Sequence, residues 1–186
     1  LLTILCLSIA SNACEKAMDP SRITSAGGSV TEIIYFLNSQ DSLVAVDVTS
    51  NFPPEARDLP SIGYVRQLSA EGVLSLDPTI IIGEDDMGPP SVMEQIKRTN
   101  VEIKIIPENH SIEGIIEKVK CVSNIIGKDS NELINKFLSP KIKRLQTLAD
   151  SEKKKKIIYI LGMQSGSPLI AGKNTSGNGL INISGG

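Results

Sequence analysis

Aromatic residues are scarce in this chain of 186 residues, which has no tryptophan, three tyrosines and three phenylalanines. Its 19 lysines and arginines stand against 21 acidic residues, so the formal net charge is −2. Proteins that bind nucleic acid usually carry a basic surface, often with aromatic side chains among the cations. The composition therefore argues against a nucleic-acid partner.

Long hydrophobic runs are also lacking. The apolar run at residues 1–10 is too short to cross a bilayer as a helix and has the length of the hydrophobic region of a signal peptide. Residues 11–13, Ser-Asn-Ala, match a small-x-small cleavage pattern, so we expect residues 1–13 to be an export signal whose amino end is incomplete. Cleavage there would place Cys14 first, where a lipid anchor can be attached. Because Asn12 is unusual in a lipoprotein signal, a soluble periplasmic product is favoured over a lipid-anchored one.

Cysteine is equally rare. Of the three cysteines, Cys6 lies in the expected signal and Cys14 at its border, which leaves Cys121 alone in a helical pattern. We therefore expect Cys121 to be a small buried apolar side chain, and the spacing implies no disulfide framework.

Short apolar runs alternate with amphipathic segments from residue 22 to about residue 126, which predicts a parallel, doubly wound α/β sheet. Ser29–Glu32 and Ser91–Glu94 have the pattern of capping boxes at helix starts, and Gly127 is a C-cap. The expected strands are 22–26, 43–48, 78–82 and 101–106, and the expected helices are 29–37, 69–76, 91–99 and 111–126.

The alternation stops at residues 130–156, which form one long helical stretch that Pro140 should kink or divide. The lysines at 153–156 are best interpreted as the solvated end of that helix rather than as a nucleic-acid or lipid patch. A strand at 157–161, a loop at 163–168, a short strand at 169–172 and a weak helix from Thr175 follow.

This pattern predicts three units after the signal. They are a first α/β lobe at 20–128, a connecting long helix at 129–156, and the truncated start of a second α/β lobe at 157–186.

A tyrosine and an arginine, Tyr64 and Arg66, stand two residues apart in a loop between a predicted strand and a helix. A free tyrosine ionises at about pH 10, so it is an anionic ligand near neutrality only where a metal or a cation stabilises the phenolate. Arg66 can supply that cation, and tyrosine is one of the few side chains that ligate haem iron. On the residues alone, an ordinary half-buried loop tyrosine is the favoured interpretation.

Four segments together resemble a known class of proteins. They are Arg22–Ile34, Gly63–Gly72, Gly88–Pro90, and Ala171–Gly172 with Thr175, and they span nearly all of residues 22–186. The chain is similar to the bacterial solute-binding proteins that serve importers of haem, ferric siderophores and cobalamin. Within that class it most resembles the periplasmic haem-binding proteins of ABC importers, because the tyrosine loop is the specific part of the match.

The resemblance implies a two-lobed solute-binding protein with parallel-sheet lobes joined by one long helix. It implies that Tyr64 is the axial ligand of the haem iron and that Arg66 supports it. Met163 stands where some members have a second ligand, a histidine, so a single tyrosinate is the favoured arrangement. His110, the only histidine, follows the fourth predicted strand, where loops face the ligand crevice of an open parallel sheet, and is a rival ligand.

In function, the resemblance implies capture of ferric haem between the lobes and delivery to an ABC permease, with an outer-membrane haem receptor system upstream. Hard phenolate oxygen favours ferric iron. No turnover is expected, and therefore no residue is expected to be catalytic and no catalytic cofactor is expected. The acidic residues Glu84, Asp85 and Asp86 are candidates by composition for docking to the permease.

Two alternatives stay open. A ferric siderophore or cobalamin could replace haem as the ligand. A nucleotide-binding α/β enzyme could instead use the turn Gly27-Gly28-Ser29 to hold phosphate at a helix N-terminus, although the turn lacks the glycine patterns of the common nucleotide-binding loops.

Overall fold

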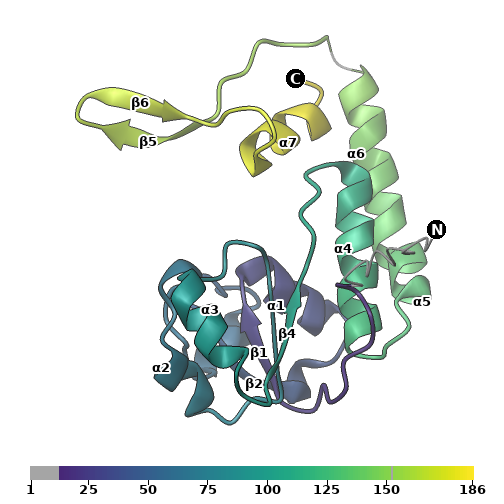
Figure 1. Ribbon diagram of the computed structural model, residues 1–186. Coiled ribbons are helices and arrows are strands. Elements are labelled where there is room, and N and C mark those ends of the chain that lie inside the picture. Colours follow the sequence, from purple (N-terminus) through teal and green to yellow (C-terminus); the bar gives the residue numbers. More distant parts are fainter. Residues whose placement is uncertain (1–12, 152) are drawn as a thin grey trace, which may run out of the picture.

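The computed structural model describes residues 13–151 and 153–186, and four short parallel strands form a sheet in the lower part of Figure 1. This sheet and the helices that cover it are called the sheet unit below. The strands are β1 (Ile23–Ala26), β2 (Leu43–Val46), β3 (Ile80–Gly83) and β4 (Glu102–Ile105), in the spatial order β2-β1-β3-β4. The four predicted strands are confirmed; each is shorter than predicted, and β3 ends one residue later, at Gly83. Because the strand order reverses between β1 and β3, the loops that follow these two strands open a crevice at the carboxyl edge of the sheet.

Helices cover both faces of this sheet. One face packs against α1 (Gly28–Phe36) and α4 (Ile112–Ile125), and the other against α2 (Ala70–Leu74) and α3 (Pro90–Ile96). In β3, Ile80 and Ile82 belong to the first core and Ile81 to the second, and all three are fully buried. The continuous apolar run of this strand therefore matches burial on both faces. Within the described part of the chain, 3₁₀ turns also occur at Gln40–Ser42 (η1), Pro54–Asp58 (η2) and Val65–Gln67 (η3).

The two predicted capping boxes are wrong. Helix α1 begins after Gly27 and α3 begins after Pro89, and neither has a side-chain cap. Pro90 is the first residue of α3. Proline suits this position because a backbone N–H there would have no partner within the helix, so its absence costs no hydrogen bond. The predicted end of α4 agrees with the structure, since Gly127 has a φ of +70°.

The long helical stretch is present in three parts, α5 (Asn131–Leu133), a π-type turn at Ile134–Leu138 and α6 (Ser139–Ser151). Pro140 is the second residue of α6. The interruption predicted at this proline is present as the π-type turn, which ends two residues before it. The helix ends near residue 151 and not at 156. Lys153–Lys156 are exposed and lie outside any helix, so their interpretation as a helix end was wrong. Four adjacent like charges disfavour a further helical turn.

The last segment is an antiparallel hairpin, β5 (Ile160–Gln164) and β6 (Ser167–Ile170), followed by α7 (Ser176–Ile183). Ser165 and Gly166 both have positive φ, as a two-residue hairpin turn requires. The predicted loop at 163–168 is therefore wrong, because Met163 lies within β5 and pairs with Pro168. Thr175 caps α7 by accepting a hydrogen bond from the Asn178 amide. The predicted domain boundaries remain predictions.

Cys121 does not stand alone, contrary to the sequence prediction. It forms a disulfide with Cys14, with the two Cα atoms 4.7 Å apart. The segment after Cys14 runs along the end of α4 in the same direction as the helix, and the Ala17 amide donates to the Ile125 carbonyl at 2.9 Å. The predicted export signal lies outside the described residues except for Ala13. Among the described helices, none is both long and apolar enough to cross a membrane.

Candidate functional site

The chain that leads to Tyr64 is held by the carboxyl end of β2. The Ile62 amide donates to the Val46 carbonyl at 2.9 Å, and the Val48 amide donates to the Gly63 carbonyl at 3.0 Å. Gly63, with a φ of +84°, then turns the chain into η3. Tyr64 therefore lies at the carboxyl edge of the sheet, with 41% of its surface exposed.

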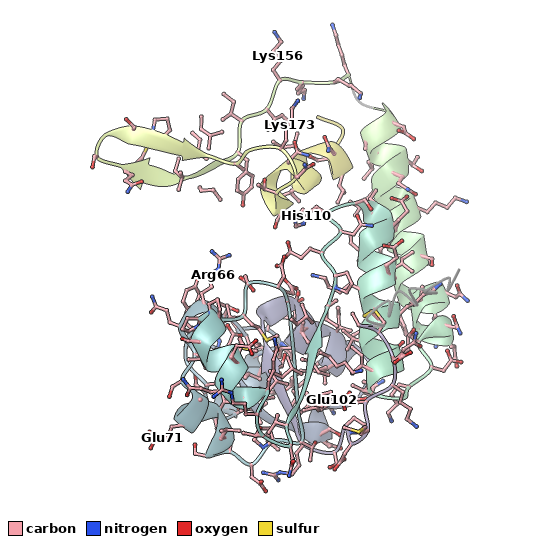
Figure 2. All side chains as sticks on the ribbon, viewed as in Figure 1. Arg66, Glu71, Glu102, His110, Lys156 and Lys173 are labelled. Atoms are coloured by element: carbon pink, nitrogen blue, oxygen red, sulfur yellow. A yellow bond between two sulfur atoms is a disulfide. The ribbon has the colours of Figure 1, made fainter. Side chains whose placement is uncertain are left out.

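Arg66 lies in η3 and is fixed by an acidic partner. Its Nε donates to Oδ2 of Asp86 at 2.9 Å. This hydrogen bond and the nearby Tyr64 phenol oxygen raise the pKa of the Arg66 guanidinium. The guanidinium is thus bonded to a carboxylate and lies near the tyrosine. In general, a cation near a tyrosine favours its charged form. Figure 2 shows Arg66 at the edge of the sheet unit that faces the hairpin and α7.

The loop after β3 braces the tyrosine loop. The Gly88 amide donates to the Val65 carbonyl at 3.0 Å, and the Leu68 amide donates to the Gly88 carbonyl at 2.8 Å. The same loop supplies Asp86. Sequence reasoning assigned Asp86 to the docking surface and missed its pairing with Arg66, because nothing local to either residue indicates a contact across 20 positions.

A second polar group lies at the point where the strand order reverses. The Glu84 carboxylate, just after β3, accepts a hydrogen bond from Lys118 Nζ at 2.6 Å and another from the Ser29 hydroxyl. Burial alone raises the pKa of Glu84, but the bonds from Lys118 and Ser29 outweigh it and lower that pKa. Burial and the nearness of Glu84 raise the pKa of Glu108. Glu84 thus has partners inside the fold and is a poor docking residue, whereas Asp85 is exposed.

These side chains line a cavity of about 680 Å³ between the sheet unit and α7. Gly28, Phe36, Thr49 and Leu180 also contribute to its wall. A neighbouring cavity of about 770 Å³ extends along the start of α4 and an adjacent face of α7, and Ile183 lines both cavities.

The turn Gly27-Gly28-Ser29 has its polar groups engaged within the protein. The Gly27 amide donates to Asp47 Oδ1 and the Gly28 amide to Thr49 Oγ1, both at 3.1 Å. The Ser29 hydroxyl donates to Glu84. A carboxylate thus already lies at the N-terminus of α1, where a phosphate would have to bind. This arrangement argues against the nucleotide-binding alternative.

His110 follows β4, as predicted, and lines both cavities. Its Nε2 lies 3.4 Å from Oε2 of Glu108, and its side chain is 27% exposed. The backbone of His110 packs closely against Gly179 of α7. Figure 2 shows it between the sheet unit and α7.

Met163 lies on the hairpin and is 67% exposed. Met163, Tyr64 and Arg66 do not line either of these two cavities. The structure therefore brings Tyr64 together with Arg66 and places His110 with Glu84, Glu108 and Lys118. Within residues 13–151 and 153–186, no group of three or more histidine, cysteine or acidic side chains is placed to hold a metal ion. An iron that arrives inside a chelate needs only one or two protein ligands.

Residues 23–186 match the sequence pattern of a family described as periplasmic binding protein. The chain belongs to the periplasmic binding protein family. Among curated family relatives, it is 23% identical over 171 residues to YvrC of Bacillus subtilis, an uncharacterized ABC transporter substrate-binding lipoprotein. It is 29% identical over 84 residues to the vitamin B12-binding protein of Pectobacterium carotovorum.

Solved structures of periplasmic haem-binding proteins share the fold. HutB of Vibrio cholerae is 32% identical with a TM-score of 0.77, and RhuT of Roseiflexus sp. RS-1 is 32% identical with a TM-score of 0.79. The alignments cover 90% and 89% of this chain but 65% and 64% of those proteins. The alignment with YvrC covers 89% of this chain and 54% of YvrC. The alignment with the vitamin B12-binding protein covers 45% of this chain and 30% of that protein. The predicted fold class and the predicted solute-binding class are confirmed.

Proposed function

We propose that the protein binds ferric haem between two lobes and delivers it to the permease of an ABC importer. Tyr64 is the axial ligand in this proposal, and Arg66, held in place by Asp86, stabilises its phenolate. The observation that carries the proposal is the bond of Arg66 to Asp86 beside a tyrosine at the carboxyl edge of the sheet. The likeness to haem-binding proteins of known structure supports the choice of haem.

The ligand chemistry supports a ferric cargo. A phenolate is a hard oxygen donor and favours ferric over ferrous iron. Tyr64 is exposed enough to meet a ligand, and its neighbours are held by backbone hydrogen bonds, so the donor is available without rearrangement of the loop. No reaction on the haem is part of the proposal, and no residue is assigned a catalytic role.

Export to the periplasm is part of the same proposal. Two observations support it, the match to the periplasmic binding protein family and the Cys14–Cys121 disulfide. Disulfides persist mainly in compartments outside the cytoplasm. The permease partner is supported by YvrC, a substrate-binding protein of an ABC transporter. An outer-membrane haem receptor upstream remains a proposal drawn from the sequence resemblance.

Titration of ferric haem into the full-length protein tests the proposal by absorption spectroscopy. We expect stoichiometric binding with a high-spin tyrosinate spectrum that is lost in Tyr64→Phe. The spectrum should persist in Met163→Ala and in His110→Ala, the two rival ligands. Binding that is unchanged in Tyr64→Phe, or lost in either rival variant, would contradict a single tyrosinate ligand.

Cobalamin is the second candidate, because several curated relatives are vitamin B12-binding proteins. Competition separates the two candidates. If cyanocobalamin binds with higher affinity than haem, and Tyr64→Phe leaves that affinity unchanged, cobalamin is the ligand.

A further inference from the structure

Cys14, the residue at which the sequence allows a lipid anchor, has its sulfur in a disulfide. We propose that Cys14 and Cys121 stay joined in the mature protein and that Cys14 is a structural residue that carries no lipid. The bond closes a loop between residues 107 positions apart and ties the start of the described chain to α4. This inference is independent of the ligand.

The position of Cys14 does not suit an anchor. Cys121 lies in α4 and is 5% exposed, and Cys14 packs against the same hydrophobic core. The sulfur of Cys14 thus faces the helix and not the solvent. A lipid chain on that sulfur would have to leave from a partly buried position against α4.

Contacts on the following residues hold the segment in the same place. Ala17 is buried in the core and its amide donates to the Ile125 carbonyl at 2.9 Å. The Met18 amide donates to Oε2 of Glu102 at 2.8 Å, at the start of β4. The Asp19 carbonyl accepts from the Thr79 hydroxyl at 2.7 Å, just before β3. Folding of this segment therefore brings Cys14 onto Cys121 and raises the local concentration of the two thiols.

The two fates of Cys14 exclude each other chemically. Disulfide formation removes two protons and two electrons from the thiols, which pass to the disulfide of an extracytoplasmic thiol oxidase through a mixed disulfide. That oxidase is left as a dithiol. A thioether-linked lipid replaces the same S–H bond by an S–C bond. A sulfur that carries the lipid cannot form the disulfide, and Cys121 would then remain a free thiol.

Peptide mapping tests the proposal on full-length protein made with its own signal and extracted without reductant. The protein is denatured in urea with N-ethylmaleimide, so that buried thiols react, and is then cleaved with trypsin. We expect peptide 121–128 linked to the peptide that ends at Lys16, and no maleimide on either cysteine until dithiothreitol is added. A maleimide on Cys121 in the unreduced protein, or a diacylglyceryl mass on the peptide that ends at Lys16, would overturn the proposal.

Cys14→Ser provides a second, independent readout. Because the proposal gives Cys14 no lipid, this variant should divide between membrane and soluble fractions as the wild type does. Cys121→Ser is the matched control for loss of the disulfide alone. A wild type that is membrane-bound, together with a Cys14→Ser variant that is soluble, would show that Cys14 is an anchor.

Discussion

Arg66 donates through Nε to Asp86 Oδ2 at 2.9 Å, and this bond joins the tyrosine loop to the loop after β3. The arginine is mostly exposed, with 62% of its side-chain surface accessible, so its orientation depends on this partner. The partnership extends the candidate site from two residues to three.

The first prediction concerns this partnership. Asp86→Asn removes the charge that holds Arg66, and should weaken ferric haem binding about 10-fold to 100-fold, the usual effect of losing a group that supports a metal ligand. Asp85→Asn is the matched control, because Asp85 is adjacent and exposed. Isothermal titration of ferric haem into each variant measures the two affinities. Equal affinities would mean that Asp86 does not support Tyr64 as the iron ligand.

The second prediction concerns the backbone before Tyr64. Gly63 has a φ of +84°, and an added Cβ there would meet no atom within 4 Å. Gly63→Ala should therefore cost about 1–2 kcal/mol through backbone strain alone. Gly72→Ala, in α2 with only ordinary contacts, should instead stabilise by about 0.5–1 kcal/mol. Urea denaturation gives both values, and the same sign for both substitutions would contradict the prediction.

The third prediction concerns the ion pair of Glu84 and Lys118, whose side chains are 17% and 19% exposed. Exposed pairs contribute about 0–1 kcal/mol, and loss of one partner from a fully buried pair costs about 3–5 kcal/mol. The cost of Lys118→Met should fall between these two values, a loss of about 1–3 kcal/mol in the free energy of unfolding at pH 7. Lys97→Met, which removes an exposed pair with Glu94, should change stability by less than about 0.5 kcal/mol.

This cost should depend on pH. The pKa of Glu84 is lower in the folded protein than its ordinary value, so its stabilising effect is present above that ordinary value and is lost as the pH falls through the lowered one. The difference between wild type and Lys118→Met should shrink from pH 7 to about pH 3, below the ordinary carboxyl pKa. A difference that stays constant over this range would show that the charge on Glu84 is not the cause.

The fourth prediction concerns the disulfide. Removal of a native disulfide typically costs about 2–5 kcal/mol, because the unfolded chain regains freedom. The double variant Cys14→Ala, Cys121→Ala should lose that amount. Dithiothreitol should lower the stability of the wild type toward that of the double variant and leave the double variant unchanged. Equal stability of the oxidised and reduced wild type would contradict a structural role.

The sequence predicted the elements whose signal is local. The apolar run in β3 and the amphipathic pattern of α4 follow directly from residue periodicity, and the tyrosine loop was found because Tyr64 and Arg66 are neighbours in the chain. The hairpin was misplaced because positive φ at Ser165 and Gly166 turns the chain where the sequence was interpreted as a longer loop.

The features that were missed join residues far apart in the sequence. Ser29 is not a cap, because it lies inside α1, and its hydroxyl bonds to Glu84, 55 positions away. The pairing of Cys14 with Cys121 is invisible to spacing arguments, since the fold alone brings the two cysteines together. The Arg66–Asp86 bond belongs to the same group. Periodicity carries no information about such contacts.

The strand order has a consequence for how the chain folds as it is made or exported from its amino end. β1 is the first strand to emerge, yet it lies inside the sheet, where Ile23 pairs with Leu43 on one side and with Ile80 on the other. Its second row of hydrogen bonds must wait until β3 has emerged. α4, which covers one face of the sheet and carries Cys121, emerges later still. A chain halted before residue 80 therefore presents β1 as an open edge, and an exported precursor must be kept from pairing through that edge until the rest has crossed.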